Sequence, residues 1–250
     1  MTKIALVTGG SRGLGRNTVI ALAKRGVDCL FTYQSKADEA AKVTAEVEAL
    51  GRKAIGLKLD VGATSSFPAF VDEVRAALAK LGDTKLDYLV NNAGIGLYVP
   101  VVETTEEQFD QLMNIHLKGP YFLTQRLLPL VRDGGRIVNL STGLTRFALP
   151  GYSAYAAMKG AVEVWTRYLA KELGARKIAV NVVAPGAIET DFGGGAVRDN
   201  AQINGFIASQ TALGRVGLPD DIGPMIASLL SDENRWVNAQ RIEVSGGMFV

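Results

Sequence analysis

The sequence predicts an α/β protein, in which helices cover both faces of one doubly wound parallel sheet of seven strands. Two features of the chain predict this fold. Short apolar, partly β-branched runs alternate with amphipathic stretches from one end to the other. The chain has 250 residues, of which 48% are hydrophobic, and it contains no linker, repeat or low-complexity segment. We therefore expect residues 1–250 to form a single domain with an ample hydrophobic core.

The expected strands are short, mostly apolar runs bounded by turn residues. They are Ile4–Thr8, Asp28–Tyr33, Lys53–Lys58, Tyr88–Asn91, Arg136–Leu140, Ala179–Ala184 and Arg241–Val244. Between them, apolar residues recur with helical periodicity. The expected helices are Leu14–Lys24, Ala37–Leu50, Ser65–Leu81, Glu106–Leu130, Ala154–Glu172 and Pro219–Leu230. Gly51 suits the end of the second helix, and Thr104 or Thr105 suits the start of the fourth.

Residues 186–215 carry neither pattern, and three glycines follow one another at 193–195. The segment is longer than connections between elements usually are. Long loops within a compact domain are commonly functional. The sequence therefore predicts an irregular loop that shapes a substrate site.

A glycine-rich turn separates the first strand from the first helix. Gly9, Gly13 and Gly15 follow the spacing G-x-x-x-G-x-G. Glycine permits a tight turn and close backbone approach, and a helix N-terminus offers free N–H groups and a positive dipole to a pyrophosphate. Strand, turn and helix together predict a Rossmann-type dinucleotide site, and a purely structural turn is the alternative. No Lys-Ser or Lys-Thr follows Gly15, which argues against a nucleoside triphosphate loop.

Polar residues also follow the carboxyl ends of four expected strands. Ligands of open α/β sheets bind beyond these ends. Any one of the four segments alone would be interpreted as a turn, but together with the glycine-rich turn they predict one shared crevice. The segments are Asp60-Val61, Asn91-Asn92-Ala93-Gly94, Ser141-Thr142-Gly143 and Pro185-Gly186-Ala187-Ile188-Glu189-Thr190.

Tyr155 and Lys159 are four residues apart in an expected helix, so their side chains share a face. A free phenol has a pKa of about 10, and a neighbouring ammonium group favours the phenolate. Lowering that pKa to about 7.5 takes roughly 3.4 kcal/mol, which a close cation in a partly dry site supplies. The pair then forms a proton donor and acceptor matched to physiological pH. A pair of ordinary surface residues is the alternative, since the spacing alone is common.

These motifs, in this order, resemble the compact branch of the short-chain dehydrogenase/reductase family. The resemblance runs from residue 3 to about residue 247 and includes the ending Val244-Ser245-Gly246-Gly247. The residues that carry it are Thr8-Gly9-x-x-x-Gly13-x-Gly15, Asp60, Asn91-Asn92-Ala93-Gly94, Asn114, Tyr155-x-x-x-Lys159 and Pro185-Gly186.

The resemblance implies a role for each motif. Tyr155 would exchange a proton with the substrate oxygen, and Lys159 would lower the pKa of Tyr155 and hold the nicotinamide ribose. Asn114 would hold a water that relays protons to Lys159. The family also implies contacts to adenine from Asp60 and Val61, to the middle of the cofactor from Asn91, Ala93 and Gly94, and to the carboxamide from Ile188 and Thr190. The complete expected cofactor site is Gly9, Ser11, Arg12, Gly13, Leu14, Gly15, Tyr33, Ser35, Lys36, Asp60, Val61, Asn91, Ala93, Gly94, Tyr155, Lys159, Pro185, Gly186, Ile188 and Thr190.

The position of the substrate-orienting hydroxyl departs from the family pattern. The family's serine usually lies about thirteen residues before the tyrosine, and position 142 is Thr here. Thr142 can donate the same hydrogen bond, although its methyl group narrows the site. Ser141 is the competing candidate, but neighbouring residues of a strand point to opposite faces. We expect Thr142 to be the catalytic hydroxyl, alongside Asn114, Tyr155 and Lys159.

The second strand ends without the acid that usually binds the free 2′-hydroxyl of NAD(H). The local run from Phe31 to Lys36 has no acidic residue, and the expected position falls at or near Tyr33. Arg12, Ser35 and Lys36 can instead surround a 2′-phosphate, since the guanidinium fork suits phosphate. We expect NADP(H), with NAD(H) as the alternative.

Composition narrows the remaining classes of function. The net charge is +2 and no basic block is present, so we expect no nucleic-acid partner. A single cysteine, Cys29, allows no intrachain disulfide, and one histidine, His116, cannot build a His-rich metal site. We expect His116 to be a packing or interface residue. No secretory signal or membrane span is apparent, which favours a cytoplasmic protein without metal.

The expected function is that of an NADP(H)-dependent carbonyl reductase or alcohol dehydrogenase, with Tyr155 as acid and base. Two alternatives remain: the same scaffold acting on a sugar or a 3-oxoacyl thioester, and a non-catalytic NADP(H)-binding regulator. The family resemblance also implies a homo-oligomer, a tetramer or a dimer, that pairs the fourth and fifth expected helices.

Overall fold

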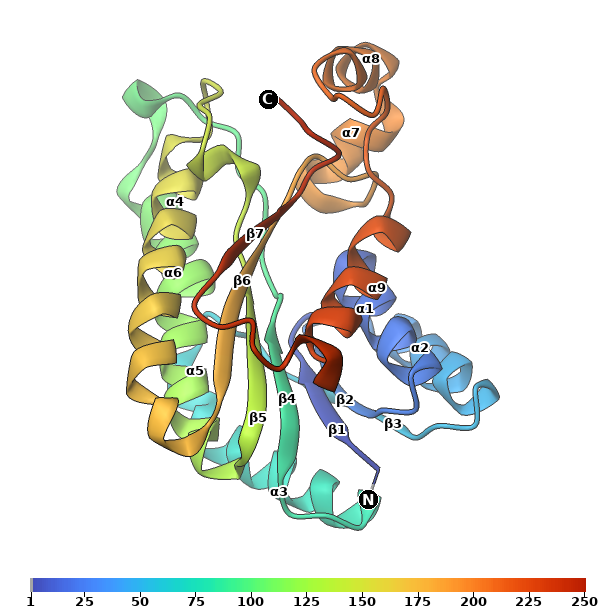
Figure 1. Cartoon of the computed structure of the whole chain (residues 1–250). Coiled ribbons are helices and arrows are strands. Elements are labelled where there is room, and N and C mark those ends of the chain that lie inside the picture. The colour runs from blue at the N-terminus through green and yellow to red at the C-terminus, as the bar shows by residue number, and fades with distance from the viewer. Residues whose placement is uncertain (1) are drawn as a thin grey trace.

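The computed structural model describes residues 2–250, and its centre is a seven-stranded parallel sheet in the order β3-β2-β1-β4-β5-β6-β7 (Figure 1). The strand order reverses at β1, which lies between β2 and β4, and such a switch point is where α/β proteins bind ligands. The predicted doubly wound α/β fold is therefore confirmed. The strands are β1 (Ile4–Val7), β2 (Asp28–Tyr33), β3 (Ala54–Lys58), β4 (Leu86–Asn91), β5 (Val131–Leu140), β6 (Ala179–Pro185) and β7 (Arg241–Val244).

Helices cover the sheet on both faces (Figure 1). On one face lie α1 (Gly13–Lys24), α2 (Ala37–Ala49) and α9 (Pro219–Leu229). On the other lie α3 (Phe67–Leu81), α4 (Glu106–Met113), α5 (Gly119–Leu127) and α6 (Ser153–Glu172). Two further helices, α7 (Ala196–Asp199) and α8 (Ala201–Ser209), stand beyond the carboxyl ends of the strands at the top of Figure 1.

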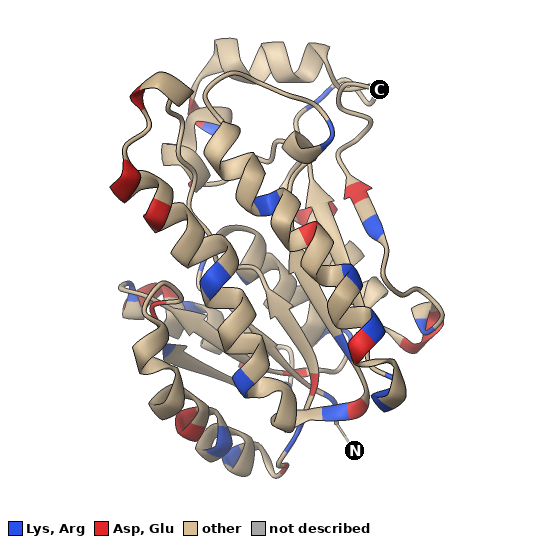
Figure 2. Cartoon of the chain, turned by 90° about the vertical axis from the view of Figure 1, so that its left-hand side faces the viewer, with Lys and Arg blue, Asp and Glu red and all other residues tan. Residues whose placement is uncertain are grey.

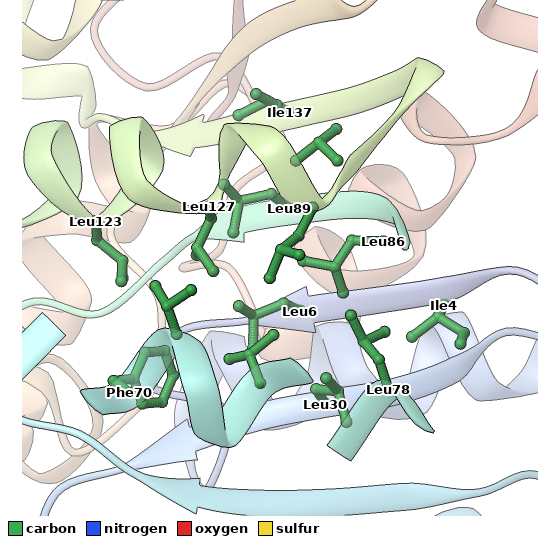
Figure 3. Close-up of a cluster of buried hydrophobic side chains, with 14 of the residues drawn as sticks. Ile4, Leu6, Leu30, Phe70, Leu78, Leu86, Leu89, Leu123, Leu127 and Ile137 are labelled. Atoms are coloured by element: carbon green, nitrogen blue, oxygen red, sulfur yellow. The ribbon is translucent and has the colours of Figure 1, made fainter. Parts of the chain in front are cut away.

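The core forms two layers, one on each side of the sheet. Figure 3 shows the layer beneath α3 and α5, where Leu6, Leu89 and Ile137 of the strands meet Phe70 and Leu127 of the helices. All these side chains are buried. Central strands covered on both faces are apolar at nearly every position, which explains why they are recognisable as continuous runs in the sequence.

Two parts of the chain differ from the sequence-based expectation. The predicted irregular loop at 186–215 contains α7 and α8, and the Asn200 side chain caps α8 by accepting hydrogen bonds from the backbone of Gln202 and Ile203. The single expected helix Glu106–Leu130 is α4 and α5 joined by a π-helical turn over Asn114–Lys118. Such turns shift the direction of the following side chains and are frequent at functional sites.

Figure 2 shows the face of the molecule that carries α4, α5 and α6, with Lys, Arg, Asp and Glu residues spread along these helices among uncharged ones. Tyr121, Phe122, Val164 and Tyr168 of these helices are exposed on the structure, and the Tyr121 and Trp165 rings lie 5.4 Å apart. Within residues 2–250, no helix has both the length and the apolar character needed to cross a bilayer.

Candidate functional site

The glycine-rich turn has a backbone that only glycine accommodates. Gly9 and Gly13 have φ of +65° and +53°, in the left-handed region. A Cβ on Gly15 would lie 2.1 Å from the Gly9 carbonyl oxygen. α1 begins at Gly13 with no side chain capping its first N–H groups. The turn thus forms a close-packed cradle at a helix N-terminus, which fits the pyrophosphate of a dinucleotide.

Asn92 fastens this cradle to the segment after β4. Its Nδ2 donates to the carbonyl oxygens of Thr8, at 2.8 Å, and Gly9, at 3.2 Å. The Thr8 hydroxyl oxygen in turn accepts hydrogen bonds from the backbone N–H groups of Asn92 and Ala93, each at 3.0 Å. The cofactor site expected from the sequence did not include the Asn92 side chain. In the sequence, an Asn in a turn is equally explained by a hydrogen bond from its side chain to the backbone of the same turn.

Tyr155 and Lys159 share one face of α6, as their spacing predicts, and both are buried, with exposures of 8% and 5%. The Lys159 ammonium donates to the Leu140 carbonyl oxygen at the end of β5, at 2.8 Å. Its Nζ lies 5.8 Å from the centroid of the Tyr155 ring. The Tyr155 hydroxyl has the Thr142 side chain as its hydrogen-bond partner. The end of β5 and the first turns of α6 therefore meet at one buried cluster.

Burial dominates the protonation of this cluster. Burial raises the pKa of Tyr155, the hydrogen bond to Thr142 lowers it in part, and the neighbouring Tyr152 raises it further. Burial also lowers the pKa of Lys159 to about 8. The expectation that Lys159 lowers the pKa of Tyr155 stays a prediction, since the Lys159 ammonium donates to Leu140 and burial is the largest influence on Tyr155. At neutral pH Tyr155 is a neutral phenol, which is a proton donor.

Ser141 points away from the cluster. Its hydroxyl donates to Glu163 Oε1 at 2.6 Å, and the same oxygen accepts from the Thr145 hydroxyl at 2.7 Å and from Arg241 Nε at 2.9 Å. Thr142, the next residue, is directed to the opposite side, as expected for neighbours at a strand end. Glu163 is thus a further residue that the sequence did not reveal, and it holds the segment carrying Thr142.

Asn114 lies at the start of the π-helical turn between α4 and α5, within the span expected for the fourth helix, and its carbonyl oxygen accepts from the backbone N–H of Gly119. No hydrogen bond joins its side chain directly to Tyr155 or Lys159 within residues 2–250, and its expected contact with Lys159 through a water stays a prediction. His116, two residues later, is buried against the Tyr155 ring. The π-helical turn changes the direction of the residues that follow Asn114 relative to a regular helix.

The expected 2′-phosphate residues lie at the surface near one carboxylate. Arg12 and Lys36 are exposed, and both lie close enough to Asp191 to lower its pKa, after the larger effect of the hydrogen-bonded Arg198. Ser35 is exposed beside Lys36, and Tyr33 is half-buried at the end of β2. Two cations from separate loops thus converge on one small region of the surface.

The segment that follows β6 also lies next to the glycine-rich turn. Thr190 lies over Gly13, where a Cβ would be 3.7 Å from the Cβ of Thr190. Ile188 forms a bridge with Gly217, and Gly186 packs so tightly that a Cβ would lie 2.9 Å from the Ser245 Cα. The segment after β6 therefore borders the crevice, as the sequence predicted.

Three expected residues after β3 and β4 are placed differently from one another. The exposed Asp60 accepts a hydrogen bond from the Gly62 backbone, and Val61 is buried with its carbonyl pressed against Gly119. The Asn91 side chain points into the core, where Nδ2 donates to the Thr124 hydroxyl and to Asn139 Oδ1. These buried partners hold the Asn91 side chain between the sheet and α5, and the expected contact of Asn91 with the cofactor stays a prediction.

Aromatic side chains surround the outer side of Tyr155. The Phe192 ring centroid lies 6.0 Å from that of Tyr155, and Tyr98 and Tyr152 pack edge to face at 5.3 Å. Phe192 and Tyr98 are 46% and 64% exposed, so they form an accessible apolar rim. Gly193, Gly194 and Gly195 follow Phe192 with φ between +62° and +78°.

Comparisons with known proteins agree with this geometry. Residues 9–249 match the family described as enoyl-(acyl carrier protein) reductase. Tetrahydroxynaphthalene reductase PfmaG of Pestalotiopsis fici is 35% identical, and the alignment covers 98% of this chain and 91% of PfmaG.

Two solved structures are similar over nearly the whole chain. The angucycline C-6 ketoreductase LanV with bound NADP is 36% identical with a TM-score of 0.94, and the match covers 99% of this chain and 95% of LanV. A further LanV structure holds NADP and rabelomycin. A short chain dehydrogenase from Burkholderia cenocepacia J2315 in complex with NADP is 36% identical with a TM-score of 0.90, and the match covers 98% of this chain and 97% of that one.

Proposed function

This chain belongs to the short-chain dehydrogenase/reductase family of oxidoreductases, and on that basis we propose that it is an NADP(H)-dependent carbonyl reductase acting on aromatic ketones. The observation that carries the proposal is the buried cluster of Tyr155, Lys159 and Thr142 beside a dinucleotide cradle. In this dry site the phenol would act as the acid, and the amine would return a proton to it. The hydroxyl would orient the substrate by donating a hydrogen bond.

The reaction then follows from the protonation of these side chains. NADPH, when bound, supplies the hydride to the carbonyl carbon. Thr142 orients the carbonyl oxygen by hydrogen bonding, and Tyr155 gives its proton to that oxygen as the alcohol forms. The tyrosinate left behind takes a proton from Lys159, whose pKa near 8 keeps it protonated at neutral pH, and Lys159 regains one from solvent. Asn114 would hold a water that relays this proton to Lys159.

Several features support NADP(H) as the cofactor. The cradle formed by Gly9, Gly13 and Gly15 would hold a pyrophosphate, because its backbone packs closely without side chains and leads into α1, whose first N–H groups have no side-chain cap. Arg12 and Lys36 would hold the 2′-phosphate, since their positive charges converge near Asp191. The similar LanV and Burkholderia structures carry NADP.

The aromatic side chains beside Tyr155 indicate the substrate class. Phe192, Tyr98 and Tyr152 offer ring faces and edges to a planar apolar molecule. PfmaG is a tetrahydroxynaphthalene reductase, and LanV was solved with rabelomycin. Residues 186–215, including α7 and α8, would shape this side of the site. A 3-oxoacyl thioester is the second candidate, because the matching family description names an acyl carrier protein, which carries acyl groups as thioesters.

The oligomeric state belongs to the same proposal. Tyr121, Phe122, Val164 and Tyr168 place exposed apolar side chains on α5 and α6. Because monomers rarely expose contiguous apolar surface without a use for it, we propose that this face pairs two copies of the chain. The whole chain would then act as one catalytic domain within a dimer or tetramer.

A substrate panel with both cofactors tests the proposal. We expect NADPH oxidation to be fastest with a bicyclic aromatic ketone, compared with an aliphatic ketone, a sugar and a 3-oxoacyl thioester, and we expect NADH to be a poorer cofactor. Arg12→Ala should raise the KM for NADPH about tenfold and leave the KM for NADH unchanged, because only NADPH carries the 2′-phosphate.

The control for Arg12 is Arg16→Ala, in the first turn of α1 just after Arg12, where the guanidinium is paired with Glu46 at 2.6 Å. It should leave the preference for NADPH intact. A preference for NADH in the unmodified protein would overturn the phosphate pocket. NADPH binding with no oxidation by any compound would support a regulator instead.

Substitutions at the two neighbouring hydroxyls test which one orients the substrate. Thr142→Ala should lower kcat about 10²-fold, since it removes the donor next to the reacting oxygen. Ser141→Ala should have a smaller effect, because that hydroxyl is bonded to Glu163. Thr142→Ser is the control and should keep most of the activity. Measured kcat values in the reverse order would refute the assignment.

A further inference from the structure

His116 is the only histidine in the chain, and it is 1% exposed in the π-helical turn between α4 and α5. Its Nε2 lies 2.9 Å from the Ile95 carbonyl oxygen and 3.3 Å from the Ile95 backbone nitrogen. One ring nitrogen cannot donate and accept at once. The shorter distance favours a proton on Nε2, donated to the Ile95 carbonyl. His116 thereby fixes the segment that follows β4.

The other side of the imidazole contacts the proposed acid. The His116 and Tyr155 ring centroids lie 5.1 Å apart with an interplanar angle of 87°, an edge-to-face contact. Gly94 makes room for the ring, because a Cβ there would lie 2.7 Å from His116 Cε1. His116 therefore joins the segment after β4 to the Tyr155 ring through one side chain.

His116 Nδ1 is buried and has no hydrogen-bond partner among residues 2–250. With Nε2 protonated, Nδ1 is a bare acceptor. Lys159 of α6 is the charged side chain that faces the imidazole, and the neighbouring Tyr155 is a neutral phenol. The segment from Asn92 to Ile95 contributes no charged side chain. A second proton on Nδ1 would place an unpaired donor and a positive charge in a dry site beside Lys159.

We propose that His116 is a positioning residue for the proton donor, holding the Tyr155 ring and the Ile95 backbone in fixed relation as a neutral imidazole. The inference rests on the proposed function for the role of Tyr155 and goes beyond it by assigning a task to His116. The side chain acts through Tyr155 and does not itself touch the carbonyl group.

A neutral buried imidazole at position 116 predicts a pH dependence of stability that an aromatic residue without a titrating group would not produce. Burial, followed by the charge of Lys159, lowers the pKa of His116 well below its usual value, and the Ile95 hydrogen bond offsets this in part. Below about pH 6.5 the His116 imidazole therefore binds a proton in the unfolded chain, whereas in the folded protein it stays neutral to lower pH. The buried neutral imidazole therefore contributes to the free energy of unfolding above about pH 6.5, and this contribution is lost as the pH falls.

Two substitutions separate the two contacts of His116. His116→Gln keeps a donor and an acceptor of similar reach for Ile95 but removes the ring, whereas His116→Phe keeps a ring and removes the hydrogen bond. With the full-length protein and NADPH, we expect His116→Phe to lower kcat about tenfold or more, because a misplaced donor slows proton transfer. The Kd for NADPH should stay within about twofold in both variants. The fall in Tm between pH 7.5 and pH 5.5 should be smaller in both variants than in the unmodified protein, since neither replacement titrates.

The surroundings of the Tyr155 ring can also be measured by NMR, without a catalytic assay. In protein with ¹³C-labelled tyrosine rings, the Tyr155 signal can be identified among the seven Tyr residues by its absence from Tyr155→Phe. We expect His116→Gln to shift the Tyr155 signal and leave the signals of distant tyrosines unchanged. A Tyr155 signal that does not respond to His116→Gln, or a His116→Phe variant with unchanged kcat, would overturn the inference. Failure of the proposed function is a separate result, namely unmodified protein that reduces no ketone.

Discussion

Replacing Tyr155 with Phe is expected to lower kcat by about 10²- to 10⁴-fold, the usual contribution of a positioned general acid. The substitution removes one hydroxyl from a buried site and leaves the ring against His116 and Phe192. The carbonyl oxygen then loses its proton donor, although the neighbouring Thr142 hydroxyl remains. Steady-state rates with a saturating aromatic ketone, together with a fluorescence titration of NADPH, measure the effect on turnover and on cofactor binding separately.

Cofactor binding should be nearly unchanged in this variant, because the cradle lies on α1 and the Tyr155 hydroxyl on α6. Tyr152→Phe provides the matched control: it alters the same residue type one turn earlier, where the side chain belongs to the aromatic rim. It should retain most of the activity. Equal losses in the two variants would show that the phenol at position 155 has no special part in the reaction.

Replacing Gly15 with Ala is expected to weaken NADPH binding about 100-fold or more, and to destabilise the protein by about 1–3 kcal/mol, as overpacking of a tight site usually does. The added Cβ would lie 2.1 Å from the Gly9 carbonyl and 2.5 Å from Asn92 Nδ2. Either the turn opens or Asn92 releases it, and both changes spoil the cradle. Isothermal titration with NADPH and urea denaturation measure the two effects.

Gly174→Ala serves as the control for Gly15, because a Cβ at Gly174 meets nothing within 4 Å and its φ is not positive. It should change neither the Kd for NADPH nor the stability by much. If Gly15→Ala bound NADPH as tightly as the unmodified protein, the cradle would not be the pyrophosphate site.

The sequence predicted the sheet and the glycine-rich turn for identifiable physical reasons. Strands buried on both faces are continuous apolar runs, and the glycines of the cradle are required by backbone geometry, so both leave a direct trace in the sequence. The helices α7 and α8 were missed because Gly193, Gly194 and Gly195 interrupt the periodicity just before them. Asn200 was the available signal, since it caps α8.

The candidate site is less predictable where the local sequence pattern does not determine the direction of a side chain. Asn114 and His116 are two residues apart, and which of them faces Tyr155 is decided by the π-helical turn, which periodicity does not show. Asn91 lies at a strand end, as expected, but Thr124 and Asn139 draw its side chain into the core. Ser141 and Thr142 were separated correctly in direction because strand alternation is a strict rule.

The most direct test of the central claim is to follow the transferred hydrogen. NADPH deuterated at the nicotinamide C4 position is incubated with the protein and an aromatic ketone, and the alcohol is analysed by mass spectrometry and NMR. We expect a single deuterium on the carbinol carbon, and little or none with Tyr155→Phe over the same time. Stoichiometric binding of NADPH without deuterium in any product, across aromatic, aliphatic, sugar and thioester substrates, would contradict it.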